Sequence, residues 1–103
     1  MNRLKIEPLI LKSIELAILD HDYGIKIVFD GTIDMIDPYN DIYPFLKNIH
    51  NEIVENNIKN VNADFINLKF MNSSGIKTFI LWLMLINEVP EEKKYVINII
   101  HNP

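Results

Sequence analysis

The spacing of apolar residues changes along the chain, and this change constrains the fold more than any other feature. From Ser13 to Leu19 large apolar residues alternate with smaller or polar ones, a period of two that is typical of a strand with one buried face. From Ile42 to Val54 apolar residues recur every three or four positions, which predicts an amphipathic helix. A chain with both patterns must pack helices on a sheet, so we expect an α/β fold.

The remaining segments continue this alternation of strands and helices. Residues 20–24 favour a turn, and the β-rich stretch that follows them predicts a hairpin. Further strands are expected at 61–65 and 94–100, the last one largely buried, with a second helix between them that runs from about residue 72 to Glu88. Residues 1–12 could add an edge strand. Because a strand reached through a helix normally lies parallel to its predecessor, we predict a mixed sheet of four to five strands with two main helices.

Two prolines leave two possible starts for the first helix. Asp37-Pro38 is typical of an N-cap and a first helical position, but a helix that begins there places Pro44 in its interior, at a cost of about 3 kcal/mol. A start at Asn40 or Asp41 places Pro44 in the first turn, where its missing N–H does no harm. We therefore predict the later start, with Asp37-Pro38 in a preceding turn.

Length, charge and hydropathy exclude several classes of protein. A chain of 103 residues fits one domain, residues 1–103, since domains typically hold about 100 to 150 residues. The net charge is -4 without a basic cluster, so we expect no nucleic acid partner. The longest apolar run, 79–86, is far shorter than the roughly 20 residues that span a bilayer, which predicts no membrane association. The absence of cysteine and of an apolar leader favours a cytoplasmic location.

No arrangement of residues indicates a catalytic, cofactor or metal site. The aspartates between residues 30 and 41 lack the spacing of a calcium-binding loop, and the glycines are isolated, so no glycine-rich loop can hold a phosphate. The histidines do not occur at ligand spacing or beside a nucleophile, and we predict that all three lie on the surface: His21, His50 and His101. We expect a non-enzymatic protein with no cofactor and no bound metal.

Two features around the second helix indicate binding. The first is Asn72-Ser73-Ser74-Gly75, which places two hydroxyls at the positive end of the helix, although simple N-capping by Ser or Asn explains the same residues. The second is the helix itself, which is apolar on nearly every side. We expect a core stripe of Ile76, Phe79, Ile80, Leu83 and either Ile86 or Asn87. Complete burial is difficult in so small a protein, so we predict that a partner or a second copy binds a surface including some of Leu81, Trp82, Met84 and Leu85.

The junction resembles the STAS family, which comprises the domain of anti-sigma factor antagonists and of sulfate transporter tails. In that family a strand carrying Asp and a short apolar bend precede Asp-Ser-Ser-Gly at the start of a helix rich in Leu and Ile. Residues 64–76, DFINLKFMNSSGI, are similar to this pattern in order and spacing. Residues 29–34, FDGTID, resemble the family's Gly-x-Leu/Ile-Asp strand end. The likeness extends from Ser13 to Ile100, and its order of elements agrees with the order derived above.

The resemblance implies a regulatory switch. In anti-sigma factor antagonists a partner kinase phosphorylates the first serine after the acidic residue and a phosphatase restores it, which corresponds to Ser73 here, with Asn72, Ser74 and Gly75 as the switch loop. Asn72 replaces the usual Asp. The substitution removes a negative charge beside the serine that the family's kinase recognises. The chain also stops at Pro103, where the family usually adds a further helix and strand, so we expect a C-terminally short STAS-like domain. The alternative is an unphosphorylated docking or dimerisation module in bacterial signalling.

Overall fold

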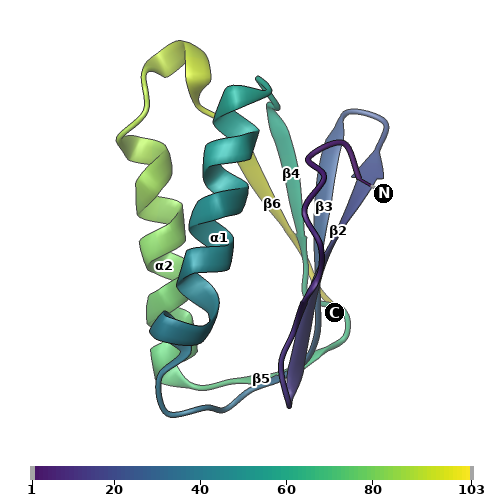
Figure 1. Cartoon of the computed structure of the whole chain (residues 1–103), viewed down its shortest axis with the longest axis vertical. Helices are drawn as coiled ribbons and strands as arrows, with labels where there is room; N and C mark the ends of the chain where they lie inside the picture. Colours follow the sequence, from purple (N-terminus) through teal and green to yellow (C-terminus); the bar gives the residue numbers. More distant parts are fainter. Residues whose placement is uncertain (1, 103) are drawn as a thin grey trace.

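A computed structural model describes residues 2–102 of the chain. Both helices lie on the same side of a single sheet (Figure 1). In chain order the elements are β1 (Leu9–Ile10), β2 (Ile14–His21), β3 (Gly24–Ile33), α1 (Pro38–Glu55), β4 (Asn60–Asp64), β5 (Leu68–Met71), α2 (Ser73–Asn87), a short 3-10 helix (Glu91–Lys93) and β6 (Val96–Ile100).

The sheet is mixed, as predicted. Its order is β1-β2-β3-β4-β6, with β2 antiparallel to β3, and β3, β4 and β6 parallel to one another. It has six strands rather than four to five, because β1 joins the β2 edge and β5 pairs with the end of β3. The pairing of β3 shifts register between Gly31 and Thr32, and Gly31 has a φ of 125°, which a side chain would strain. The irregularity at Gly31 thus lies where β3 passes from β4 to β5.

The start of α1 differs from the prediction. The helix begins at Pro38 rather than at Asn40 or Asp41, because the Asp37 side chain caps it. Its Oδ1 accepts from the backbone N–H of Asn40 at 3.2 Å, and its Oδ2 accepts from the Asn40 side chain at 2.7 Å. Pro38 is buried, so packing also holds the first turn. Pro44 lies inside the helix but on its exposed side, where water can pair with the carbonyl that proline leaves free.

The core lies between the sheet and the two helices. On α1 the predicted residues Ile42, Leu46 and Ile49 are buried, as expected from their helical spacing. Burial of the last strand was predicted wrongly: β6 is the edge of the sheet, and Val96 and Ile99 are 59% and 49% exposed. A β-branched segment has the same composition whether it lies at the centre or at the edge of a sheet, so its sequence could not show this.

One histidine lies in the core instead of on the surface. His50 is buried on α1, and its Nδ1 lies 2.7 Å from the hydroxyl of Tyr95, which is buried just before β6. Burial lowers the pKa of His50 and raises the pKa of Tyr95, since both charged forms lose hydration. His101 is exposed and His21 is partly exposed, so the prediction of a surface position fails for His50 alone.

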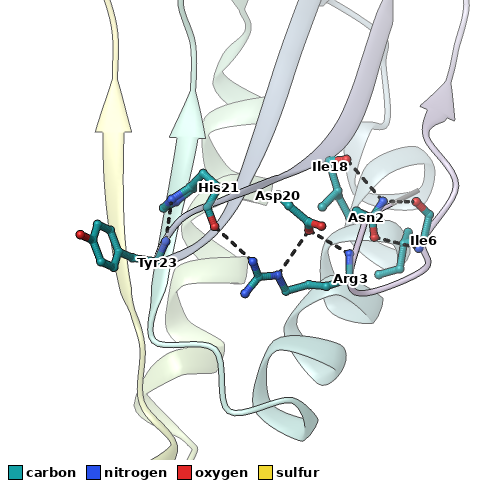
Figure 2. A network of polar contacts seen from close by, with 7 residues as sticks. All are labelled: Asn2, Arg3, Ile6, Ile18, Asp20, His21 and Tyr23. Carbon is teal, nitrogen blue, oxygen red and sulfur yellow. Dashed lines mark hydrogen bonds and ion pairs between the residues drawn. The ribbon is translucent and has the colours of Figure 1, made fainter.

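The N-terminal segment is tied to the β2–β3 hairpin (Figure 2). The Asn2 side chain donates to the carbonyl of Ile18 at 3.3 Å, and the backbone N–H of Arg3 donates to Asp20 Oδ1 at 2.8 Å. The Arg3 guanidinium also donates to the carbonyl of His21 at 3.2 Å. These contacts are largely exposed and stabilise the fold by no more than about 1 kcal/mol for the ion pair. Together with β1, they cover the β2 edge of the sheet.

Candidate functional site

Asn72 joins three parts of the chain at the start of α2. Its Oδ1 accepts from the backbone N–H of Gly75 at 2.7 Å, which makes Asn72 the N-cap. Its Nδ2 donates to the carbonyl of Met35 at 3.0 Å, and its backbone N–H donates to the carbonyl of Ile33 at 2.9 Å. The loop between β3 and α1 is therefore held against the beginning of α2.

Ser73 occupies the first position of α2 and is exposed. Of the two residue types considered for capping, serine and asparagine, it is the asparagine, Asn72, that caps the helix. Among residues 2–102 the Ser73 hydroxyl has no hydrogen-bond partner. Ser74 is also exposed, and its carbonyl accepts from the Thr78 hydroxyl at 2.9 Å. The Ser73 hydroxyl is therefore accessible and is not required to hold the helix in place.

Gly75 lets α2 approach the ends of β3 and β5. It is buried, and a Cβ at this position would lie 2.8 Å from both Ile33 Cγ2 and Met71 Cγ, closer than carbon atoms pack. The predicted phosphorylation site, Ser73, thus lies together with the predicted switch loop of Asn72, Ser74 and Gly75. These residues supply a cap, two exposed hydroxyls and a close contact with the sheet.

A groove of about 260 Å³ runs beside this junction, between the β3–α1 loop and α2. Its lining is Ile36, Asp37, Pro38, Tyr39, Ser74, Lys77, Thr78 and Leu81. Ile36 is 99% exposed, and the half-exposed Tyr39 ring stacks on Tyr43 with centroids 4.8 Å apart. Ile36 and Tyr39 were not predicted from the sequence as surface features. The only signal was an isoleucine beside the Asp-Pro break, where the chain has no regular element in which to bury it.

The four residues predicted for the partner surface differ in exposure. Leu81 and Met84 are exposed, and Leu85 is partly buried. Trp82 was assigned to this surface wrongly, because it is fully buried and its ring packs edge-on against Phe79 with centroids 5.4 Å apart. Of the four predicted residues, Leu81 and Met84 are the ones that a partner can reach.

The buried face of α2 is rotated from the predicted stripe. Ile76 and Ile80 were expected in the core but are 49% and 48% exposed, and Leu83 is only partly buried. The buried residues are Gly75, Thr78, Phe79 and Trp82. Gly75 lets the start of the helix sit close to the sheet, and the fully buried Trp82 fills space further along the helix. The sequence did place small residues, Gly75 and Thr78, at helical spacing on this face. A search for a stripe of large apolar residues does not detect them.

Other kinds of site find no support in the described part of the chain. Within residues 2–102, no three His, Cys, Asp or Glu residues gather where they could hold a metal ion. Nor is any helix in that range both long enough and apolar enough to cross a membrane. The groove lining carries one carboxylate, Asp37, and one ammonium, Lys77.

Comparison with known proteins bears on the fold. No protein-family model and no curated protein sequence matches the chain. Among solved structures it is similar to an anti-sigma factor antagonist from Mycobacterium paratuberculosis, with a TM-score of 0.59 and 20% sequence identity. The similarity covers 88% of this chain and 69% of that one. The chain has a STAS-like fold. At this level of identity the likeness establishes the arrangement of the sheet and two helices, in agreement with the resemblance seen in residues 29–34 and 64–76.

Proposed function

We propose that the chain is a non-enzymatic regulatory binding protein of the bacterial cytoplasm, in which phosphorylation of Ser73 controls binding to a protein partner. The observation that carries the proposal is the Ser73 hydroxyl, exposed at the first position of α2 and free of any capping role among the described residues. The fold shared with an anti-sigma factor antagonist supports a regulatory role of this kind.

Phosphorylation of Ser73 would be tolerated by the fold. It adds roughly -1.5 to -2 charges beside the N-terminus of α2, where the helix dipole stabilises an anion by about 0.3 to 1 kcal/mol. The bonds that hold the junction together are made by Asn72, so the phosphate replaces none of them. A serine kinase related in kind to an anti-sigma factor ATPase would add the phosphate, and a phosphatase would remove it.

The same phosphate would weaken binding to a partner. The groove beside α2 and the exposed Leu81 and Met84 form the adjoining contact surface, with Ile36 and Tyr39 on the opposite wall. A partner seated there must desolvate or repel the new charge. Loss of one well-made contact at an interface costs about 2 to 5 kcal/mol, which is a fall of about 30-fold or more in affinity.

The test is a pull-down from the native host with Ser73→Ala and Ser73→Asp, together with the intact mass of the recovered protein. We expect Ser73→Ala to retain the partner, Ser73→Asp to lose it, and the recovered wild type to carry one phosphate. Ser74→Ala is the matched control, since it removes the neighbouring exposed hydroxyl and should still acquire the phosphate. Equal retention of the partner by the alanine and aspartate variants would contradict the proposal.

The alternative function is an unmodified docking or dimerisation module with the same fold. Its support is the fully exposed Ile36 beside Tyr39 and Leu81, an apolar surface that needs no phosphate to bind a partner. Under this alternative the Ile36→Asp variant loses the partner, whereas both Ser73 variants bind it as the wild type does.

A further inference from the structure

In the part of the chain that the structure describes, the outer edge of β6 is unprotected. The sheet ends at β6, and within residues 2–102 no strand pairs with its outer side, whereas β1 and the N-terminal segment cover the opposite end. Natural edge strands usually carry a charge, a proline or a bulge that prevents pairing with another chain. β6 has none of these, since its five residues are Val-Ile-Asn-Ile-Ile and its register with β4 is unbroken.

The backbone of β6 shows which groups are free. Val96 donates its N–H to the carbonyl of Lys59 at 2.9 Å, and the carbonyl of Ile100 accepts from Phe65 at 2.7 Å. The peptide groups of Val96, Asn98 and Ile100 therefore turn toward β4. The direction of the peptide groups alternates along a strand. The N–H and carbonyl groups of Ile97 and Ile99 therefore turn outward, away from β4. Ile97 and Ile99 thus present two N–H groups and two carbonyls at the edge.

An apolar flank of α2 lies above the same edge. The groove side of α2, with Lys77 and Leu81, faces α1, so Ile76 and Ile80 lie on the flank away from α1. Since α1 joins β3 to β4 and α2 precedes β6, crossovers of the same hand place α2 on the β6 side of α1. On the strand, Ile99 pairs with the buried Ala63 and therefore points to the helix side, yet it is 49% exposed. Ile76, Ile80 and Ile99 thus expose apolar side chains along both the helix flank and the sheet edge.

We propose that a second copy of this chain occupies this surface, with the two β6 strands paired antiparallel about a two-fold axis at Asn98. In this register Ile97 faces Ile99 of the second copy, and Ile99 faces Ile97 of the second copy. All four outward peptide groups are then hydrogen-bonded. A register centred on either isoleucine would leave part of them unpaired within β6.

The side chains fit the same axis. Asn98 is exposed on the open face of the sheet, and its Nδ2 donates to Asn62 Oδ1 at 3.3 Å. One amide hydrogen and the Asn98 carbonyl oxygen remain for Asn98 of the second copy. The Cα atoms of that pair would lie about 4.5 Å apart, as in other pairs without backbone hydrogen bonds. An asparagine on a two-fold axis can both donate to its own copy and accept from it.

A stable dimer interface must include both the β6 edge and the α2 flank. A stable interface buries about 800 Å² on each partner, which a five-residue strand cannot supply alone. The α2 flank adds the exposed parts of Ile76 and Ile80, which would lie toward the α2 flank of the second copy. Each copy carries a net charge of -4, so added salt should strengthen the association by screening the repulsion between them.

Sedimentation velocity over a range of concentrations tests the proposal. The wild type should form a dimer, more strongly at high salt. Asn98→Asp places two like charges opposite each other at the axis and should raise the dissociation constant by about tenfold or more. The matched control is Asn62→Asp, which adds the same charge one strand further in and should dimerise as the wild type does.

A second pair of variants tests the edge itself. Ile99→Lys adds a charge to the β6 edge and should abolish the dimer, whereas Ile10→Lys adds one to the exposed β1 edge and should leave it intact. Far-UV circular dichroism checks that all four variants fold. A wild type that stays monomeric up to about 1 mM, or a dimer unaffected by Asn98→Asp and Ile99→Lys, would overturn the proposal.

Discussion

Replacing Asn72 tests the contacts that hold the candidate site together. The Asn72→Ala variant loses two hydrogen bonds at once, one to the N–H of Gly75 and one to the carbonyl of Met35. Loss of an N-cap costs about 1 kcal/mol, and loss of a second partly buried hydrogen bond costs about another 1 kcal/mol. We expect a loss of about 2 kcal/mol in the free energy of unfolding, which in a domain of this size lowers Tm by about 8 to 16 °C.

The Asn72→Asp variant separates the two bonds. A carboxylate keeps the cap and gains about 0.3 to 1 kcal/mol from the dipole of α2. It cannot donate to the carbonyl of Met35, however, and instead places a negative oxygen against it. We expect this variant to be less stable than the wild type and more stable than Asn72→Ala at pH 7. The asparagine that replaces the family's aspartate would then serve to hold the β3–α1 loop.

Thermal unfolding followed by circular dichroism measures all of these variants under one set of conditions. Ser73→Ala is the control, because it removes an exposed hydroxyl with no partner among the described residues and should change stability by less than about 0.5 kcal/mol. If Asn72→Ala and Ser73→Ala have the same Tm, the reasoning about the cap is refuted. If Asn72→Asp equals the wild type, the bond to Met35 contributes nothing.

Three further predictions concern the packing of the two helices. Gly75→Ala should destabilise the protein by about 1 to 3 kcal/mol in thermal melts despite the better helix propensity of alanine, because the new methyl group would meet Met71 at 2.8 Å. Trp82→Ala should cost about 3 to 5 kcal/mol in denaturant unfolding, whereas Met84→Ala should leave the midpoint nearly unchanged, since only the tryptophan is buried. Burial lowers the pKa of His50 in the folded state, so its contribution to stability should be complete above about pH 6.5 and decrease as the pH falls below that value. A His50→Phe variant should lack this dependence in unfolding measured from pH 7.5 to 5, and an unchanged pH profile would show that another group is responsible.

The order of elements and the place of the candidate site followed from local sequence. The alternation in β2 and the helical spacing in α1 are periods that a chain must satisfy wherever it folds, and both elements occur where they were expected. The junction at Asn72 was also recognisable, because capping involves residues only three apart in the sequence. The motif at that junction implied a STAS-like fold only together with residues 29–34 and the order of elements.

Tertiary structure alone decided which surfaces of these elements are covered. The sequence of α2 is apolar on nearly every side, so its pattern allowed several buried faces, and the contact of Gly75 with the sheet selected the one that buries Trp82 and exposes Ile80. Likewise, the composition of β6 suits a central strand, but the sheet order leaves it at the edge. His50 is buried because Tyr95, 45 positions away, supplies its hydrogen bond. Local periods determine which residues share a face, whereas the neighbours of that face come from distant parts of the chain.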